Sequence, residues 1–285
     1  MIDESLMLDV NGIRMHTVTT GQGPTVLLLH GFPDTHIVWR KQIAVLAAAG
    51  YRVLAPDLRG YGRTDAPSGA ASYTLEKLRG DVLGLLDALK IDKVSLVGHD
   101  WGGLIGWQLA ALAPQRIERL VALSTGHPSA IARAGILQHL RMTYVLGFIL
   151  PGIAEHTLKA GDWLMMRQFT GEPGQADHWK RDLSPPGRLT AVLNYYRANL
   201  GLALPDGLPR VQVPVMGIWS DGDPALGEKQ MRDSARYVDA AFRFERIHDA
   251  DHWLQLTAHE RVNRLLLDFL SGPAHSASGT HSAAA

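Results

Sequence analysis

The chain of 285 residues contains no cysteine, which excludes disulfide bonds and thiolate metal sites. Basic and acidic residues balance at 28 each, so no surface of one charge sign is expected to attract nucleic acid or a membrane. No apolar run approaches the roughly 18 residues that a membrane span requires, and the acidic N-terminus lacks the pattern of a signal peptide. These absences favour a soluble cytoplasmic protein, and we expect a monomer or a homodimer. A chain of this length can bury a full hydrophobic core.

The sequence does contain a regular alternation of apolar strands and amphipathic helices. Residues 6–10 and 13–19 flank Asn11-Gly12, a strong hairpin signal, and predict two antiparallel edge strands. Further strands are predicted at 25–29, 51–55, 94–97, 117–123, 215–219 and 242–247, and helices at 37–49, 74–90, 104–113, 228–238 and 258–270. Alternating strands and helices build a mostly parallel sheet with helices on both faces, so the predicted fold class is α/β.

The alternation is interrupted once. Residues 127–205 have a helical pattern, many aromatic side chains and several Pro-Gly breaks, and they contain no convincing strand. We interpret this region as an inserted helical cap, or lid, and assign residues 1–126 and 206–271 to one core domain. The last stretch, 272–285, is rich in Ser, Ala and His and is expected to be a disordered tail.

The stretch Gly98-His99-Asp100-Trp101-Gly102 lies between a predicted buried strand and a predicted helix. A strand, a tight glycine turn and a helix form the context of a nucleophile elbow, in which the central residue stands clear of the sheet. The helix N-terminus behind that residue favours an anion. The central residue here is Asp100. The simpler interpretation is a glycine-rich turn in which Asp100 only caps the helix.

A carboxylate at this position restricts the chemistry. It is already an anion at neutral pH, but it is a weak nucleophile toward amides. It can displace a strained or good leaving group at an sp3 carbon, which gives an ester on the enzyme that water must hydrolyse. The sequence therefore predicts a two-step hydrolysis with Asp100 as the nucleophile.

Polar loops that follow parallel strands meet at one edge of the sheet, where ligands bind. The chain order nucleophile, acid, histidine is that of the α/β-hydrolase triad, and it selects Asp223 and His252 as the partners of Asp100. Asp221 is the rival acid in the same loop, with a turn-capping role as its alternative. His248 is the rival histidine, and a surface-loop position suits it better.

Three more polar residues are weighed against these roles. Asp249 and Asp251 are so near His252 in sequence that they seldom reach its ring nitrogen from the correct side. His30 directly follows a predicted strand, and we expect it to be a structural histidine that bonds its own loop.

Four motifs together carry a resemblance to a known family. The sequence resembles the epoxide hydrolases of the α/β-hydrolase fold over residues 6–270, through His30-Gly31-Phe32-Pro33-Asp34, Asp57-x-x-Gly60-Tyr61-Gly62, Gly98-His99-Asp100-Trp101-Gly102-Gly103 and Asp251-His252-Trp253. The combination of His-Gly-x-Pro and Gly-x-Asp-Trp-Gly is typical of hydrolases with an aspartate nucleophile. Haloalkane dehalogenases share it, so these motifs leave the leaving group open.

The resemblance also implies roles for two cap tyrosines, whose hydroxyls would donate to the epoxide oxygen. Tyr144 precedes a Phe-x-x-Pro-Gly segment and Tyr196 lies in a Leu-Asn-aromatic-Tyr-Arg segment, as in the family. The alternative for each is a core aromatic residue. The backbone N–H groups of Phe32 and Trp101 would form the oxyanion hole. The implied substrate-binding side chains are Phe32, Trp101, Phe148, Tyr195 and Trp253.

The expected reaction is the opening of a small apolar epoxide by water to a vicinal diol, with no metal and no organic cofactor. Two alternatives remain open: a haloalkane or haloacid dehalogenase with the same triad, and a non-catalytic binding protein of the same fold. A serine esterase that uses Ser95 or Ser124 is disfavoured, because neither serine lies in an elbow.

Overall fold

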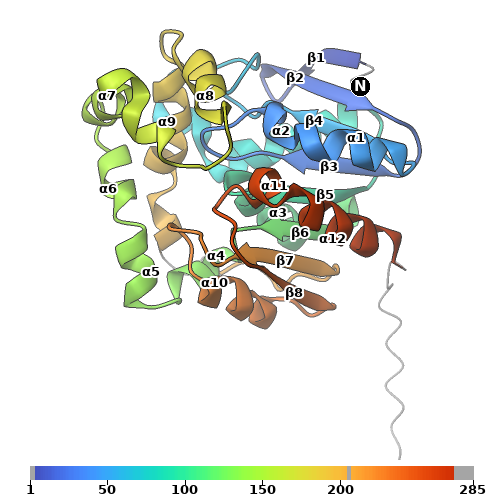
Figure 1. Ribbon diagram of the computed structural model, residues 1–285. Helices are drawn as coiled ribbons and strands as arrows, with labels where there is room; N and C mark the ends of the chain where they lie inside the picture. The colour runs from blue at the N-terminus through green and yellow to red at the C-terminus, as the bar shows by residue number, and fades with distance from the viewer. Residues whose placement is uncertain (1–3, 204–206, 273–285) are drawn as a thin grey trace, which may run out of the picture.

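The computed structural model describes residues 4–203 and 207–272, and its centre is one eight-stranded sheet (Figure 1). The strand order is β1-β2-β4-β3-β5-β6-β7-β8. The strands span β1 Glu4–Val10, β2 Ile13–Thr20, β3 Thr25–Leu29, β4 Arg52–Pro56, β5 Val94–His99, β6 Ile117–Leu123, β7 Val215–Ser220 and β8 Phe242–Ile247.

The pairing of these strands confirms the predicted α/β class. Strand β2 pairs with β1 and β4 in antiparallel fashion, and the pairs from β4 through β3, β5, β6 and β7 to β8 are parallel. The hairpin between β1 and β2 turns at Asn11 and Gly12, which both have positive φ as a two-residue primed turn requires. The predicted edge hairpin is therefore confirmed.

Helices pack on the sheet, with α1 against α12 and α3 along β5 and β6 with α2 beside it. Their bounds are α1 Arg40–Ala48, α2 Leu75–Ala88, α3 Trp101–Leu112, α10 Glu228–Asp233, α11 Leu254–Thr257 and α12 His259–Ser271. Short 3-10 turns connect them: η1 His36–Trp39, η2 Ala70–Tyr73, η3 Pro114–Arg116 and η5 Ser234–Tyr237.

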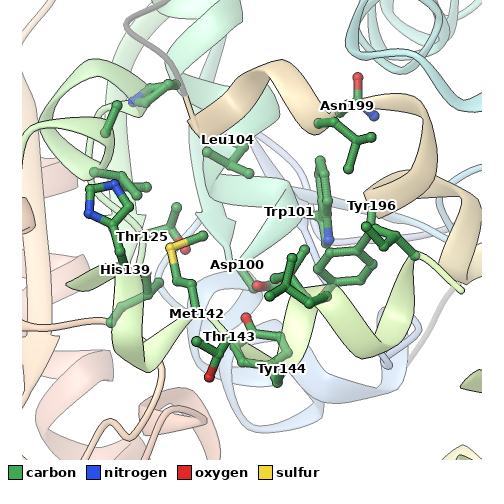
Figure 2. A pocket seen from close by; sticks show the side chains of 18 residues that line it. Asp100, Trp101, Leu104, Thr125, His139, Met142, Thr143, Tyr144, Tyr196 and Asn199 are labelled. Atoms are coloured by element: carbon green, nitrogen blue, oxygen red, sulfur yellow. The ribbon is translucent and has the colours of Figure 1, made fainter. Parts of the chain in front are cut away.

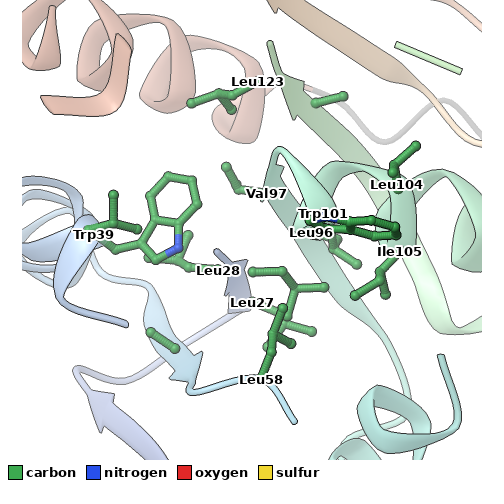
Figure 3. Packing of buried hydrophobic residues seen from close by; sticks show 14 of the residues in the cluster. Leu27, Leu28, Trp39, Leu58, Leu96, Val97, Trp101, Leu104, Ile105 and Leu123 are labelled. Atoms are coloured by element: carbon green, nitrogen blue, oxygen red, sulfur yellow. The ribbon is translucent and has the colours of Figure 1, made fainter. Parts of the chain in front are cut away.

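The central strands are buried on both sides, as expected for a parallel sheet between two helix layers. Figure 3 shows Trp39 and Ile105 on opposite sides of the side chains of β3 and β5. Leu96 and Val97 are both completely buried, and they point to opposite faces because side chains alternate along a strand. Burial on this scale holds the carboxyl ends of β3 and β5 in place, and the candidate site lies at these ends.

Between β6 and β7 the named elements of the described chain are all helical, as the pattern predicts, and Val211 forms one isolated β-bridge with Val238. This segment contains α4 Pro128–Ala132, α5 Ile136–Arg141, α6 Tyr144–Phe148, α7 Ile153–Arg167, α8 Gln175–Leu183, α9 Arg188–Ala198 and η4 Leu200–Ala203. No single described helix is long and apolar enough to cross a membrane, although the bent pair Ile136–Phe148 and Ile153–Arg167 passes that test when taken together.

Element boundaries differ from the predicted ones where 3-10 turns replace α-helix. The helix predicted at 37–49 is η1 followed by α1, because Thr35 accepts from the backbone N–H of Ile37 and starts a tighter turn. The helix predicted at 228–238 is α10 followed by η5. The helical turn α11 follows the polar loop directly and was not predicted. The predicted tail lies, apart from Gly272, outside the described residues.

Candidate active site

Asp100 occupies the turn between β5 and α3 in a strained backbone conformation, with φ 52° and ψ −118°. Such a conformation costs on the order of 1–3 kcal/mol and persists only where the surroundings impose it. Glycines impose it here through close approach. A Cβ on Gly98 would lie 2.3 Å from the carbonyl oxygen of Gly102, and a Cβ on Gly102 would lie 2.1 Å from the carbonyl oxygen of Leu29.

The two oxygens of the Asp100 carboxylate have different surroundings. Oδ1 accepts a hydrogen bond of 2.8 Å from the backbone N–H of Phe32, and Oδ2 lies 3.8 Å from Nε2 of His252. Burial raises the pKa of Asp100, while His252 and the backbone N–H groups of Phe32 and Trp101 oppose that shift. One oxygen is thus held by backbone donors, and the other faces the histidine.

His252 lies between two carboxylates. Its Nδ1 is 2.7 Å from Oδ2 of the fully buried Asp223, whose Oδ1 accepts from the backbone N–H groups of Ala225 at 2.8 Å and Leu226 at 2.9 Å. These two backbone bonds fix the Asp223 carboxylate, and the carboxylate fixes the ring of His252 with Nε2 toward Asp100. The structure therefore brings the three predicted triad residues together.

The charge state of His252 depends on both carboxylates. Burial alone would lower the pKa of the imidazole, but Asp223 and Asp100 outweigh it and raise the pKa of His252 to about 9. The ring of the resting protein is therefore a cation at neutral pH. Loss of either negative charge would bring its pKa down.

Two tyrosines from the inserted helical segment lie with Asp100 in a cavity of about 350 Å³ (Figure 2). Tyr144 comes from α6 and Tyr196 from α9, and a second cavity of about 300 Å³ is lined by the same three residues. Tyr196 is 8% exposed, whereas Tyr144 is 39% exposed with its hydroxyl turned toward Asp100 in Figure 2.

Both phenols remain protonated donors. Burial and the Asp100 charge raise the pKa of Tyr144 and of Tyr196, and a hydrogen bond from the Trp101 side chain opposes the shift at Tyr196. The two cavities meet at a carboxylate and two hydroxyl donors. This arrangement can present an electrophilic carbon to Oδ2 of Asp100 and an oxygen leaving group to the two phenols.

Comparisons with known proteins agree with this geometry. The α/β hydrolase fold family matches residues 24–258. Epoxide hydrolase 1 of Siraitia grosvenorii is 39% identical over 94% of this chain and 98% of its own, and the AB hydrolase superfamily protein YfhM of Bacillus subtilis is 34% identical over 92% and 96%. The crystal structure of the epoxide hydrolase VrEH1 from Vigna radiata has a TM-score of 0.83 at 31% identity, covering 94% of this chain and 97% of that one.

The chain belongs to the epoxide hydrolases of the α/β-hydrolase fold. The family resemblance that the motifs indicate is thereby confirmed, and so is the prediction that the protein is an epoxide hydrolase. The roles of individual residues remain predictions.

The rival acid and histidine form a pair of their own at the surface. Oδ2 of Asp221 lies 2.7 Å from Nδ1 of His248, and Oδ1 of Asp221 accepts from the backbone N–H of Asp249 at 2.9 Å. The side chain of His248 is 67% exposed, and this pair lines neither cavity. Asp251 accepts instead from the Thr170 hydroxyl at 2.8 Å and from the backbone N–H of Gly171 at 2.9 Å.

His30 has the structural position that the sequence predicts. Its buried ring donates from Nδ1 to the Gly31 carbonyl at 3.0 Å and accepts at Nε2 from the backbone N–H of Leu58 at 2.9 Å. Burial lowers the pKa of His30 to about 4, so the ring is neutral and links the loops after β3 and β4.

Four of the five predicted substrate-binding side chains line the cavities: Phe32, Phe148 and Trp253 line one, and Trp101 lines the other. Tyr195 lines neither. It is completely buried, its hydroxyl donates to the Arg59 carbonyl at 2.7 Å, and its ring packs against Tyr61 and Trp101. Adjacent residues of a helix point about 100° apart, so Tyr195 faces the core when Tyr196 faces the cavity.

Sequence reasoning missed residues that position the histidine loop. His99 donates from Nε2 to the His252 carbonyl at 3.0 Å, and the Ser124 hydroxyl donates to the same carbonyl at 2.9 Å. Burial holds the pKa of His99 well below its usual range, so the ring is neutral. The sequence shows only that His99 and Ser124 lie at or just after the ends of predicted strands. This places them at the same edge of the sheet as the triad but does not predict that they bond to the His252 carbonyl.

One cluster within the described residues has donor atoms close enough to hold a metal ion: His16, His36 and Asp57. Each histidine places Nδ1 2.7 Å from a different oxygen of Asp57, which is a hydrogen-bond distance. Burial acts against ionisation, but these two bonds hold the pKa of Asp57 well below its usual range. The cluster lies on β2, η1 and the loop after β4, and it lines neither cavity.

Proposed function

We propose that this hydrolase opens a small apolar epoxide with water to a vicinal diol through a covalent ester on Asp100. The proposal rests on the different surroundings of the two Asp100 oxygens. Oδ1 accepts from a backbone N–H, whereas Oδ2 faces His252 and is the oxygen that would attack the substrate. Water is the second substrate, and no step requires a metal or an organic cofactor.

In the first step, Oδ2 of Asp100 attacks one carbon of the epoxide ring and the carbon–oxygen bond breaks. An alkoxide is a poor leaving group, so the hydroxyls of Tyr144 and Tyr196 stabilise the charge that develops on its oxygen. The mostly apolar lining of the cavities supports an apolar substrate. One phenol gives its proton to the alkoxide and regains a proton from solvent, so the product of this step is a hydroxyalkyl ester of Asp100.

In the second step, water attacks the ester carbonyl. The carbonyl oxygen is Oδ1, which already lies against the N–H of Phe32, so the oxyanion hole needs no rearrangement. His252, held by Asp223, takes one proton from water at Nε2. As the intermediate collapses, the other water proton passes to the departing alkoxide, which releases the diol and restores the Asp100 carboxylate.

We infer that residues 127–205 act as the cap of this site and that residues 1–126 and 206–271 act as its core. The cap would supply both phenols and the core the triad, so a substrate would be bound between them. The tyrosine pair and the names of the relatives favour an epoxide over an alkyl halide, because a halide leaves without a proton donor.

The origin of the product oxygen tests this mechanism. In a single turnover in oxygen-18 water with enzyme in excess, the new diol oxygen comes from Asp100, so the diol should be mostly unlabelled. The peptide that contains Asp100 should gain the label. Label in the first-turnover diol with none on that peptide would mean direct hydration and would refute the covalent step.

A further inference from the structure

A second buried carboxylate lies beneath the candidate site. Asp34 has no exposed surface, and three side-chain N–H groups donate to it. Oδ1 accepts from Nε1 of Trp179 at 2.6 Å and from Nε2 of Gln175 at 2.9 Å, and Oδ2 accepts from Nε1 of Trp253 at 2.8 Å. The mechanism above does not use this group.

The three donors come from two parts of the chain that must keep their relative position. Gln175 and Trp179 lie on α8 in the proposed cap, whereas Trp253 directly follows His252. The Trp253 ring packs edge-on to the His252 ring, with centroids 5.0 Å apart, and lies 5.1 Å from the Trp179 ring. Asp34 is therefore the polar link between α8 and the neighbour of the proposed base.

The chemistry of this contact admits only an acceptor with two free oxygens. An indole N–H is a donor with no acceptor atom, so neither tryptophan can adapt by reversing its hydrogen bond. Burial raises the pKa of Asp34 to about 7, although the three donors oppose that shift. The ionised form accepts from all three donors and has no proton of its own to place in the contact.

A second carboxylate ties the other side of His252 to the cap. Oδ1 of Asp251 accepts from the backbone N–H of Trp253 at 2.8 Å, and Oδ2 accepts from the Thr170 hydroxyl and from the backbone N–H of Gly171 at 2.9 Å. The residue before His252 is thus a carboxylate that binds the segment between α7 and α8, and the residue after it is bonded to a carboxylate that binds α8.

We propose that Asp34 is a positioning residue for His252: by fixing the Trp253 indole against α8, its carboxylate sets the orientation of the imidazole that activates water. This role rests on the proposed two-step mechanism. It assigns to Asp34 the hydrolysis of the ester and not its formation, because Asp100 and the two tyrosines are positioned by other contacts.

The variant Asp34→Asn tests this role with almost no change in volume. If its amide oxygen stays with Trp179 and Gln175, its NH₂ group faces the Trp253 N–H, and two donors then oppose each other. The indole must tilt, and a displacement of the base by about 1 Å can cost on the order of 100-fold in rate. We expect ester decay to slow by about 10- to 100-fold, with ester formation within about threefold of the wild type.

Quenched single turnovers followed by intact-protein mass spectrometry give both rates. Asp177→Asn is the matched control, because Asp177 lies on the same helix, is 67% exposed and bonds only to Arg167 among the contacts described. Trp253→Phe removes the opposed donor. The double variant Asp34→Asn/Trp253→Phe should decay no more slowly than Asp34→Asn alone, since the two changes act on one contact.

Two results would overturn this role. One is an Asp34→Asn variant with wild-type ester decay. The other is slower ester formation with unchanged decay, which would make Asp34 only an anchor of the cap. A wild-type protein that never forms an ester would overturn the proposed mechanism and this role with it, and the wild-type trace separates that case from the others. Thermal unfolding of each variant verifies that it is folded.

Discussion

In the proposed mechanism Tyr144 and Tyr196 should not contribute equally to epoxide opening. Tyr196 is 8% exposed and its ring is enclosed by Trp101 and Phe148 at 5.1 and 5.2 Å. These contacts hold its hydroxyl firmly in the cavity. The Tyr144 hydroxyl also faces Asp100, but 39% of the residue is exposed and its ring pairs only with Phe148 among the described aromatic contacts, so this donor is held less firmly. We therefore expect Tyr196→Phe to be the more damaging change.

The magnitudes follow from the surroundings of each hydroxyl. Removal of a buried donor to a developing oxyanion costs about 3–4 kcal/mol, so Tyr196→Phe should slow ester formation by several hundredfold. A donor that is held less firmly is worth about 1–2 kcal/mol, so Tyr144→Phe should slow it roughly tenfold. The double variant should nearly abolish turnover, because the alkoxide would then leave without a donor.

The rate of ester formation in a single turnover is the proper assay, since turnover at steady state can be limited by the second step. Tyr195→Phe is the matched control, because it removes a buried hydroxyl from the adjacent residue, which lines neither cavity. It should lower stability but not this rate. A larger loss for Tyr144→Phe than for Tyr196→Phe, or wild-type rates for both, would refute the reasoning.

Two further changes test the rest of the site. His252→Gln should form the ester and accumulate it, visible by intact mass. The variant should also change the pH dependence of the free energy of unfolding, measured with urea. On folding, the pKa of His252 rises from 6.5 to about 9, so the wild type gains roughly 3 kcal/mol below pH 6.5 and loses it as the pH rises through 9. His252→Gln should lack this contribution. Wild-type turnover or an unchanged pH profile would contradict this. Gly102→Ala drives a Cβ against the Leu29 backbone and should cost more than about 3 kcal/mol, whereas Gly147→Ala on α6 meets nothing within 4 Å and should be tolerated in thermal unfolding.

Much of the fold could be predicted because its signals are local. The hairpin at Asn11, the buried strand 94–97 and the elbow after it each depend on a few consecutive residues. The glycine pattern around Asp100 also indicates a strained central residue, and the backbone angles of Asp100 agree with it. What the sequence could not give is the reason for each glycine: a Cβ on Gly98 or Gly102 would lie about 2 Å from a backbone oxygen.

The parts that escaped prediction depend on contacts between distant residues. Asp34 accepts hydrogen bonds from the indoles of Trp179, 145 positions away, and Trp253, 219 positions away. No residue near Asp34 in sequence predicts these two donors. The motif selects Tyr196, but it also led to the prediction that Tyr195 binds substrate, because only the rotation of α9 shows that the Tyr195 ring faces the core. The motifs predicted the reactive side chains at the edge of the sheet. Which other side chains hold them in position depends on tertiary packing, which the sequence does not show.

The position of His252 between two carboxylates lets the first step prepare the second. In the resting protein Asp100 and Asp223 both raise the pKa of the imidazole, so at neutral pH it is a cation and cannot accept a proton from water. Esterification of Asp100 removes one of these negative charges, while burial continues to favour the neutral ring. We therefore expect the pKa of His252 to fall once the ester forms and its proton to pass to solvent, which leaves the ring able to accept a proton from water. In the proposed mechanism the charge of Asp100 therefore sets the order of events: an anion attacks first, and only its loss releases the base.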